Sequence, residues 1–511
     1  MTQEKISVPG LSVCAVLLTA LSLSIGWGVR GNWGHEYGAM IPGALSAMAA
    51  VLLSGREDWR RRVIFFAFFG ALGWSFGGSM SYGIVIGYTH SHHLPSVAYG
   101  FACLFVIGFL WGVIGGVGTA LPAIFNRERL TEFFAPICAV FAAWWMQEIA
   151  QNRGWLSDSR FNWYDTDWIA ALLALVVLGI YAAVRRRWNP ACSMILHMAG
   201  GWWAAFLILV VGLGIRMTPP RGDNWAGCLG MALGLWIYCL RNGMISVVRV
   251  SLQTGLFAGF GFSAANLLKL MCIATGWIAN WHSVLEQMFG FISGVGVAVA
   301  LGYVSTRWPR LDDESNSRSW TQPFSIAFVL LLITYVNIQK NIESVWLPNK
   351  VVLASMYGLP IEWWFNLAYA AIALVVLILV IRHSYSPLPL IPPTWLGKGQ
   401  AFYLLFLWWI VIGNLSRYLP FDPIRLITEG VIHINACICT LLVLLCPRKT
   451  EIVPAFPQPD DRKLIFKTLG IGLVVIVAAI GIQTVITMGL FDAPDGNAHF
   501  RFGPQAWIPP R

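Results

Sequence analysis

The chain has 511 residues, of which 57% are hydrophobic and 11% charged, and its mean hydropathy is +0.66. Soluble domains carry about 25% charged residues, so this composition excludes an ordinary water-soluble protein and predicts a polytopic membrane protein. The formal net charge is +10, but Lys and Arg lie scattered in short clusters between apolar runs. This pattern excludes the continuous basic surface of a nucleic-acid-binding domain. We therefore expect the lipid bilayer and a small-molecule solute as partners, and no nucleic acid; the oligomeric state stays open.

Apolar stretches that are bounded by charges, Pro or Gly and are long enough to cross a bilayer follow one another along the chain. They predict an all-α fold with about fifteen transmembrane helices, at residues 11–29, 37–53, 63–86, 97–124, 133–149, 168–184, 194–215, 225–240, 250–273, 284–304, 324–338, 361–381, 401–415, 426–446 and 464–490. The first helix has no Ala-x-Ala-like cleavage site after it, so we interpret it as an uncleaved span and not as a signal peptide.

The basic residues alternate between the two sides of this helix series. The N-terminus and the loops after even-numbered helices hold 22 of the 34 Lys and Arg residues, the other side holds 11, and one lies within a helix. Cytoplasmic loops are enriched in Lys and Arg. We therefore expect an integral protein of the cytoplasmic (inner) membrane, with the N-terminus inside and the C-terminus outside.

The seventh predicted helix resembles the first. Leu-Ser-Ile-Gly-Trp-Gly-Val-Arg at 23–30 corresponds to Leu-Val-Val-Gly-Leu-Gly-Ile-Arg at 209–216, and weaker matches follow in the same order. These are 73–76 with 259–262, 108–112 with 290–294, and 174–178 with 373–377. Since six helices is an even number, two such repeats would face the same way and be related by an axis along the membrane normal, as in many transporters.

The repeat predicts three domains. They are a first six-helix repeat at 1–190, a second at 191–386, and a three-helix C-terminal extension with an outer tail at 387–511. With basic loops at 54–62 and 241–249, this arrangement is similar to that of the major facilitator superfamily. The residues Gly-Arg-Glu-Asp-Trp-Arg-Arg-Arg at 55–62 differ from that family's Gly-x-x-x-Asp-Arg-x-Gly-Arg pattern. The resemblance thus implies an architecture and no particular substrate.

Two polar junctions interrupt the apolar sequence at the outer ends of helices. The first contains Arg30, His35 and Glu36 between glycines, and the matching junction of the second repeat contains Arg216 and Asp223. Both place an arginine and an acid ahead of a helix N-terminus, which suits an anionic or hydroxyl-rich ligand. The alternative is an external hairpin that is tied by its own salt bridge. Four more candidate substrate-binding residues fall near the same depth, namely Gln147, Glu148, Asn266 and Lys269.

Three charged or titratable residues at this depth also have an interpretation that involves no substrate. Lys269 could instead extend to the outer lipid headgroups. His282 and Glu286, which open the tenth predicted helix, are expected to face water.

The fourteenth predicted helix carries Arg425, Glu429 and His433 at intervals of four, which places them on one face at steps of about 6 Å. Histidine titrates near neutral pH, so Glu429 and His433 are candidates for proton coupling. The alternative is a polar seam that docks the last helices on the repeats.

We expect no metal ion and no cofactor. Residues 90–93 read His-Ser-His-His without an acid or Cys beside them, and the ten cysteines form no Cys-x-x-Cys pair. The glycine-rich stretch 108–118 lacks the Gly-Lys-Ser/Thr of a phosphate-binding loop, which argues against an ATP-driven pump.

The leading hypothesis is a secondary active transporter, such as a symporter, for a small polar solute that is carbohydrate-like or anionic. It would bind the solute in a wet cavity that opens outward between the repeats, and it needs no catalytic residue. The alternative is a membrane-embedded transferase that modifies a glycan or lipid at the outer face, with His35 as general base and Glu36 or Asp223 orienting it. A non-catalytic assembly subunit is the third option.

Overall fold

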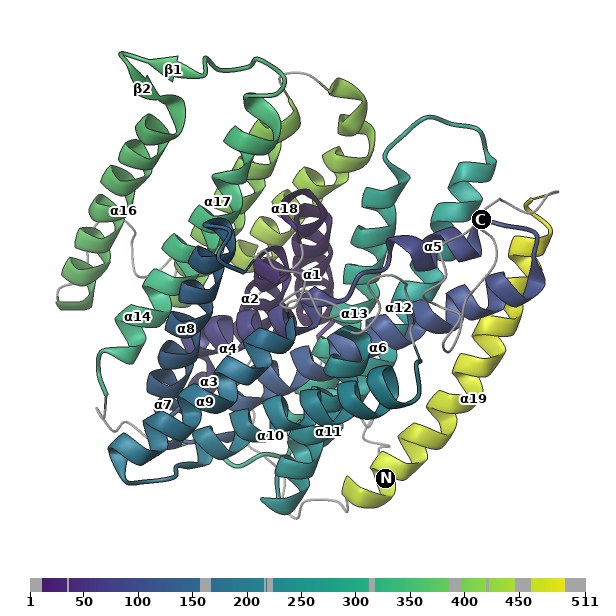
Figure 1. Ribbon diagram of the computed structural model, residues 1–511, viewed down its shortest axis with the longest axis horizontal. Helices are drawn as coiled ribbons and strands as arrows, with labels where there is room; N and C mark the ends of the chain where they lie inside the picture. The colour runs from purple at the N-terminus through teal and green to yellow at the C-terminus, as the bar shows by residue number, and fades with distance from the viewer. Residues whose placement is uncertain are drawn as a thin grey trace, which may run out of the picture.

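The structure is a computed structural model, and it describes residues 12–34, 36–156, 167–215, 217, 224–311, 318–385, 397–419, 422–445 and 461–491. Nearly all of these residues are helical (Figure 1). The first part of the chain forms α1 (Val13–Trp33), α2 (Glu36–Leu52), α3 (Glu57–Arg60), α4 (Val63–Phe76), η1 (Gly77–Ser79), α5 (Gly83–Thr89), α6 (Leu94–Ile124), α7 (Arg127–Thr131), α8 (Phe134–Asn152) and α9 (Asp167–Arg185).

The second part contains helices interrupted by π-helical turns. It forms α10 (Pro190–Ala205), η2 (Phe206–Gly212), α11 (Asn224–Arg241), α12 (Ile245–Ala274), α13 (Trp281–Ser305), α14 (Thr321–Ala327), η3 (Phe328–Ile333), α15 (Thr334–Ile338), η4 (Ile342–Trp346), α16 (Ile361–Tyr385), α17 (Lys398–Tyr418), η5 (Pro423–Arg425), α18 (Leu426–Leu445) and α19 (Asp461–Met488). A short antiparallel hairpin, β1 (Ser355–Met356) with β2 (Leu359–Pro360), precedes α16.

Each of the fifteen predicted spans overlaps a helix, which confirms an all-α polytopic membrane protein. By length and composition, 12 helices of the described segments can cross a membrane, and the pair Val63–Ser79 and Gly83–Thr89, bent by 65°, brings the number to 13. The remaining two predicted spans correspond to α2, which has 17 residues, and to α11, which is not among those candidates. The count of fifteen therefore stays a prediction.

The centre of the bundle is built from α1, α2, α4, α6, α12 and α13, whose backbones approach one another closely (Figure 1). Glycines allow this approach, as is common between membrane helices. A Cβ atom on Gly290 of α13 would lie 2.5 Å from the carbonyl oxygen of Leu23 in α1. A Cβ atom on Gly43 of α2 would lie 2.3 Å from the carbonyl oxygen of Gly70 in α4. The pairs α1–α13 and α2–α4 thus depend on the absence of side chains at these positions.

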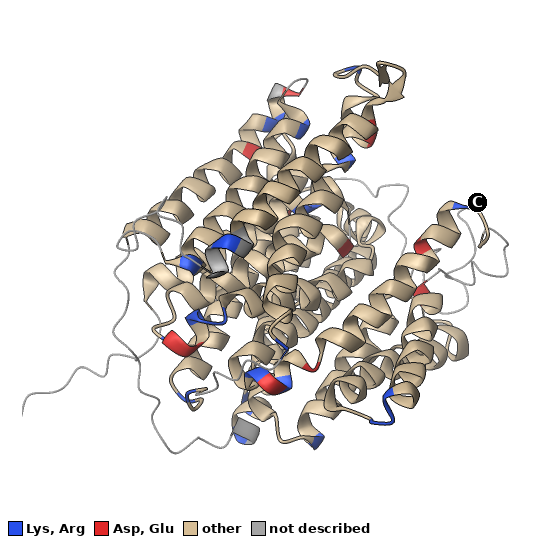
Figure 2. Cartoon of the chain, turned by 90° about the vertical axis from the view of Figure 1, so that its left-hand side faces the viewer, with Lys and Arg blue, Asp and Glu red and all other residues tan. Residues whose placement is uncertain are grey.

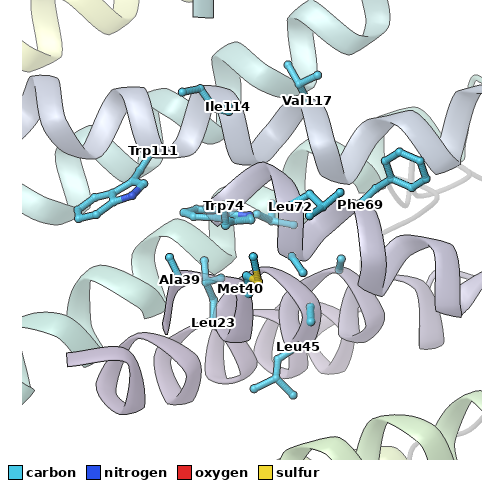
Figure 3. Packing of buried hydrophobic residues seen from close by; sticks show 14 of the residues in the cluster. Leu23, Ala39, Met40, Leu45, Phe69, Leu72, Trp74, Trp111, Ile114 and Val117 are labelled. Carbon is cyan, nitrogen blue, oxygen red and sulfur yellow. The ribbon is translucent and has the colours of Figure 1, made fainter. Parts of the chain in front are cut away.

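Large aromatic side chains fill the space between these helices. Figure 3 shows Trp74 of α4 and Trp111 of α6 lying between α6 and the helices that carry Leu23 and Met40. Trp27 of α1 meets Trp111 edge to face, with 4.7 Å between the ring centroids. Such contacts stabilise by about 0.5–1.5 kcal/mol beyond the burial of area, so they help fix α1 in the centre.

The ends of the bundle differ in charge. At one end, here called the Arg56 end, the fully buried Arg56 donates to the carbonyl oxygens of Ser305 (3.0 Å) and Trp308 (2.8 Å) beyond α13. Arg62 donates to the carbonyl oxygen of Phe125 (2.7 Å), so loops that follow even-numbered predicted helices meet there. Figure 2 shows Lys and Arg mostly near the ends of helices. The opposite end, where α1 ends and α13 begins, is called the Arg30 end.

The outermost helices present apolar side chains to their surroundings. Leu367 of α16 is 63% exposed and Val474 of α19 is 69% exposed, which fits contact with lipid. Figure 1 places α16 and α19 at opposite edges of the bundle. The division into two repeats and an extension, and the cytoplasmic location of the Arg56 end, remain predictions.

Candidate functional site

An arginine in the last turn of α1 is buried at the Arg30 end of the bundle. Arg30 is 2% exposed, and its Nη1 atom lies 3.2 Å from Oε1 of Glu286 in α13. The same nitrogen donates to the hydroxyl oxygen of Tyr82 at 3.0 Å, and that hydroxyl donates to Oε1 of Glu286 at 2.6 Å. The three side chains form a closed triangle of charge-assisted hydrogen bonds, which are stronger than neutral ones.

Local backbone features bring these three residues together. Tyr82 lies just past the turn η1, in the break where α4 gives way to α5. Asn280 caps α13 by accepting a hydrogen bond from the backbone N–H of Ser283 (3.4 Å), so Glu286 falls in the second turn of that helix. Gly31 leaves room for the carboxylate, since a Cβ atom there would lie 2.1 Å from Oε2 of Glu286.

Aromatic rings surround the Arg30 guanidinium. Its central carbon lies 5.1 Å from the ring centroids of Trp27 and Trp111 and 5.6 Å from that of Tyr82. Each contact is a cation–π interaction, which gains strength when water is excluded. Among the described residues, the carboxylate of Glu286, the hydroxyl of Tyr82 and three ring faces therefore contact the guanidinium.

One member of this group reaches the surface. The ring of His282 stacks on that of Tyr82, with 5.9 Å between centroids and 7° between planes. Its Nε2 atom lies 3.3 Å from the Tyr82 hydroxyl and 3.7 Å from Oε1 of Glu286, while the side chain is 43% exposed. Arg30, Tyr82, His282 and Glu286 together are called the Arg30 cluster.

A second buried carboxylate lies at the same end. Glu429 of α18 is 1% exposed, and its two oxygens accept from Nδ2 of Asn280 and Nδ2 of Asn414, each at 3.3 Å. Gln287 donates from Nε2 to Ser283 (3.0 Å) and to the carbonyl oxygen of Thr428 (3.0 Å). Glu429, Asn280, Ser283, Gln287 and Asn414 are called the Glu429 cluster.

Amide side chains connect the Glu429 cluster to a surface ion pair. Asn414 accepts from Asn32 of α1 (2.8 Å), and Asn32 accepts from Arg425 (3.2 Å). Arg425 pairs with Asp422 at 3.0 Å, and both are about one-third exposed. The Arg425 charge thus reaches Glu429 through two neutral amides instead of by direct contact.

The predicted substrate-binding residues of the first junction and of α8 meet at the rim of this end. The hydroxyl of Tyr37 donates to Oε2 of Glu148 (3.1 Å), next to the exposed Glu36. Lys340 lies 5.4 Å from the Tyr37 ring centroid and donates to the carbonyl oxygen of Trp33 (2.7 Å). Gln147, which precedes Glu148, has a buried Oε1 atom with no hydrogen-bond partner among the described residues.

Asn266 and Lys269 lie on α12, beside the broken helix. Asn266 is fully buried and donates to the hydroxyl of Thr89 in α5 (2.8 Å). Lys269 is half-buried, and its charge acts on His282 of the Arg30 cluster. Asn266 therefore braces α5, whereas Lys269 lies within electrostatic reach of the cluster.

The predicted stripe on the fourteenth span is arranged differently from the expectation. Arg425 belongs to η5, just before α18, and turns towards Asn32. The ring of His433 bonds through Nδ1 to the backbone carbonyl oxygen of Glu429 (3.1 Å) and not to its carboxylate. His433 and the Glu429 carboxylate consequently share no direct hydrogen bond.

One expectation about water is wrong. Glu286 was expected to face water, but it is 2% exposed because the first turns of α13 pack against α1. The wet cavity that was expected to open outward between the repeats stays a prediction. A small cavity lies at the Arg56 end, lined among others by Thr19, Ser54, Trp59 and Ser305.

Three predicted residues, His35, Arg216 and Asp223, lie outside the described residues. An Arg30–Glu36 salt bridge, the alternative reading of the first junction, is not formed; Arg30 pairs with Glu286. Within the described segments, no three His, Cys, Asp or Glu side chains come together as ligands for a metal ion.

Sequence reasoning missed the roles of Tyr82, Asn280, Gln287 and Asn414. A signal was available for Tyr82, because Gly-Gly-Ser at 77–79 breaks an otherwise apolar span. Asn414 directly follows the long apolar stretch 401–413, where a buried amide needs a partner. Nothing in the local pattern indicates which distant helix supplies that partner.

Comparison with known proteins gives one partial match. No protein-family model matches the chain. The chain is 30% identical over 107 residues to proteins described as "Fluoride-specific ion channel FluC" from two strains of Chloroflexus aurantiacus, J-10-fl and Y-400-fl. The match covers 19% of this chain and 82% of each relative. Together with its apolar helices, this similarity places the chain among membrane transporters and channels.

Proposed function

Because the chain belongs, through a segment of 107 residues, to the family of fluoride-specific ion channels, we propose that it moves a small anion across the membrane. This choice narrows the two expected solute classes to the anionic one. Within the structure, the observation that carries it is the Arg30 guanidinium, which is 2% exposed and pairs with a carboxylate at 3.2 Å. An ionisable group held in a membrane bundle is by default a functional group.

The Arg30 cluster offers an anion the donors it needs. The Arg30 guanidinium and the Tyr82 hydroxyl both point their hydrogens at Oε1 of Glu286. An incoming anion would replace that carboxylate at the same two donors, since both present a negative charge. In this proposal Glu286 acts as a tethered competitor, and the described arrangement is the occluded state.

His282 gives this exchange a route to the surface. Its half-exposed ring stacks on Tyr82 and lies 3.7 Å from Glu286. When Glu286 swings away from Arg30, the His282 ring is the adjacent hydrogen-bonding partner for the carboxylate. An anion could then pass the Tyr82 hydroxyl while the carboxylate stays paired.

Coupling to a cation gradient would make the protein a secondary active transporter. The sequence suggested protons carried by Glu429 and His433. Since His433 contacts the backbone of Glu429, the carboxylate of Glu429 alone is the candidate coupling group in our proposal. The transferase alternative depends on His35 and stays a prediction.

The test is anion flux through the full chain reconstituted in liposomes, with fluoride and chloride followed by ion-selective electrodes. We expect efflux of at least one of the two ions. Tyr82→Phe removes one hydrogen bond to a charged partner, which is worth about 1.5–3 kcal/mol, so anion affinity should fall about 10- to 100-fold.

Arg61→Gln is the matched control for loss of a positive charge, because Arg61 is a surface residue at the Arg56 end whose side chain is 63% exposed. It should leave flux unchanged, whereas Arg30→Gln should abolish flux. Equal flux in wild type, Arg30→Gln and protein-free liposomes would refute the proposal.

A further inference from the structure

The Glu429 cluster has the composition of a cation site. Glu429 is 1% exposed, and no Lys, Arg or His side chain of the described residues forms a salt bridge with it within 4.0 Å. Its hydrogen-bond donors are neutral, namely two asparagine amides, each at 3.3 Å. A buried carboxylate with neutral partners keeps a large cost of desolvation unless a cation compensates it.

A second observation supports a ligand here. Gln287 is 6% exposed, and its Oε1 atom has no hydrogen-bond partner among the described residues. The Nε2 atom of the same amide is fully engaged with Ser283 and the carbonyl oxygen of Thr428. Buried acceptors without a donor are rare, so this oxygen calls for a partner that the protein does not supply.

The two oxygen-bearing groups lie next to each other. Ser283 accepts a hydrogen bond from Nε2 of Gln287 (3.0 Å), and its backbone N–H donates to Asn280 (3.4 Å), which in turn donates to the Glu429 carboxylate (3.3 Å). Gln287 also donates to the carbonyl oxygen of Thr428, the residue before Glu429 (3.0 Å). The Gln287 amide and the Glu429 carboxylate are therefore neighbours at the contact between α13 and α18. Hard cations prefer such oxygen donors.

We propose that the Glu429 cluster binds a monovalent metal cation of the sodium type, with Glu429 and Gln287 as ligands. A single carboxylate matches a single positive charge. Both carboxylate oxygens accept amide hydrogens, which fits an ionised group, whereas a protonated acid would turn one of these oxygens into a donor. The inference rests on the proposed transport function, for which Na⁺ would be the coupling ion.

Two arginines near the cluster are paired with other carboxylates, so the negative charge of Glu429 is less compensated than that of Glu286. Arg30 is paired with Glu286, and Arg425 with Asp422. Arg417 of α17 donates to Asn341 and senses Glu429 at longer range. On α18 itself, His433 faces the backbone of Glu429. The remaining negative charge at this point is that of Glu429.

The experiment measures binding apart from transport. The full chain in detergent is heated with increasing Na⁺, and K⁺ or N-methylglucamine keeps the ionic strength constant, while tryptophan fluorescence reports unfolding. We expect a rise in Tm that saturates with Na⁺, because a ligand that binds the folded state stabilises it. Glu429→Gln should abolish the rise, and Gln287→Ala should weaken the apparent Na⁺ affinity on the order of 10-fold.

Glu343→Gln removes an exposed carboxylate of η4 and is the matched control that keeps the Na⁺ response. If Glu429→Gln does not fold, the Na⁺-dependent rise in Tm is measured on Gln287→Ala and Asn280→Ala, and a weaker response in these variants supports the inference. A Tm that responds to pH but not to Na⁺ would assign a proton to Glu429 and overturn the inference, as would an equal Na⁺ response in Gln287→Ala. Sodium binding without anion flux would contradict the proposed function alone, and flux without sodium binding would contradict this inference alone.

Discussion

Arg30 and Glu286 are 256 positions apart in the chain, yet their side chains meet at 3.2 Å at the Arg30 end of the bundle, each almost completely buried. This contact joins α1 to α13, the two helices whose backbones approach at Gly290. The ion pair joins these two central helices at one end, and a seam of small residues forms the adjacent part of their contact.

Breaking this pair on one side should destabilise the protein strongly. Glu286→Gln leaves the Arg30 charge buried without a counter-charge, which costs about 3–5 kcal/mol in comparable buried pairs. The double variant Arg30→Gln/Glu286→Gln removes both charges and should recover most of that loss. Thermal unfolding of the purified full chain checks this prediction. Additive losses in the double variant would show that the two residues do not interact.

The glycine seam between α1 and α13 makes a second prediction. Gly290→Ala places a methyl group 2.5 Å from the Leu23 carbonyl oxygen, so α1 and α13 must separate. We expect destabilisation of about 1–3 kcal/mol, as for overpacked cores, despite the higher helix propensity of Ala. Gly179→Ala in α9 is the matched control, because no atom lies within 4 Å of its added methyl group, and it should be neutral or stabilising. Equal melting shifts in both variants would contradict the role of the seam.

How much of this the sequence predicts can be judged from individual residues. Spans such as α6 and α12 follow directly from apolar length, because the bilayer requires it. The sequence indicates Arg30 and Glu429 as candidate functional residues, because a charge at the end of or inside an apolar stretch needs a partner or a function. It does not indicate their partners, because Glu286 and Asn280 lie near a helix start, where exposure to water is expected. Which helices pair depends on how small residues pack in three dimensions, and the periodicity of a single sequence does not predict these pairs.

The Arg56 end makes a prediction about pH. Burial by itself would raise the pKa of Asp58, but the Arg56 guanidinium, at 2.6 Å, and the backbone N–H of Leu311, at 3.1 Å, hold the pKa of that carboxyl below its ordinary value. Because the folded-state pKa is the lower one, the stabilisation is fully present above the ordinary value of 3.8 and is lost as pH falls through the folded-state pKa.

Asp58→Asn should therefore unfold more easily than wild type at pH 5–8, and the difference should shrink in strongly acidic solution. Melting curves of both proteins across this range provide the measurement. A difference that stays constant down to the lowest pH would contradict an electrostatic origin.

Asn341 connects α1 to α17 through hydrogen bonds. It is fully buried, and its Oδ1 atom accepts from Nε1 of Trp33 (2.7 Å) and from Arg417 (3.1 Å), while Nδ2 donates to the carbonyl oxygen of Gly413 (2.9 Å). Asn341→Ala removes the acceptor of the Trp33 indole N–H and of the Arg417 Nη1 atom, and each lost partner costs about 1–3 kcal/mol. Asn341→Asp keeps the acceptor and should lose less stability. Equal loss in the two variants, by thermal unfolding, would argue against the hydrogen bonds.

The orientation in the membrane is the last prediction, and it follows from the basic residues of the Arg56 end. Trp155, after α8, is 70% exposed and lies at the Arg30 end, whereas Trp188, before α10, is 48% exposed and lies at the Arg56 end. Cytoplasmic loops attract Lys and Arg, so a cysteine at 155 should react with a membrane-impermeant maleimide in intact cells, and one at 188 should react after the cells are opened. The wild-type chain supplies the background from its ten cysteines. Labelling of 188 in intact cells, with 155 protected, would invert the topology and place the Arg30 cluster on the cytoplasmic side.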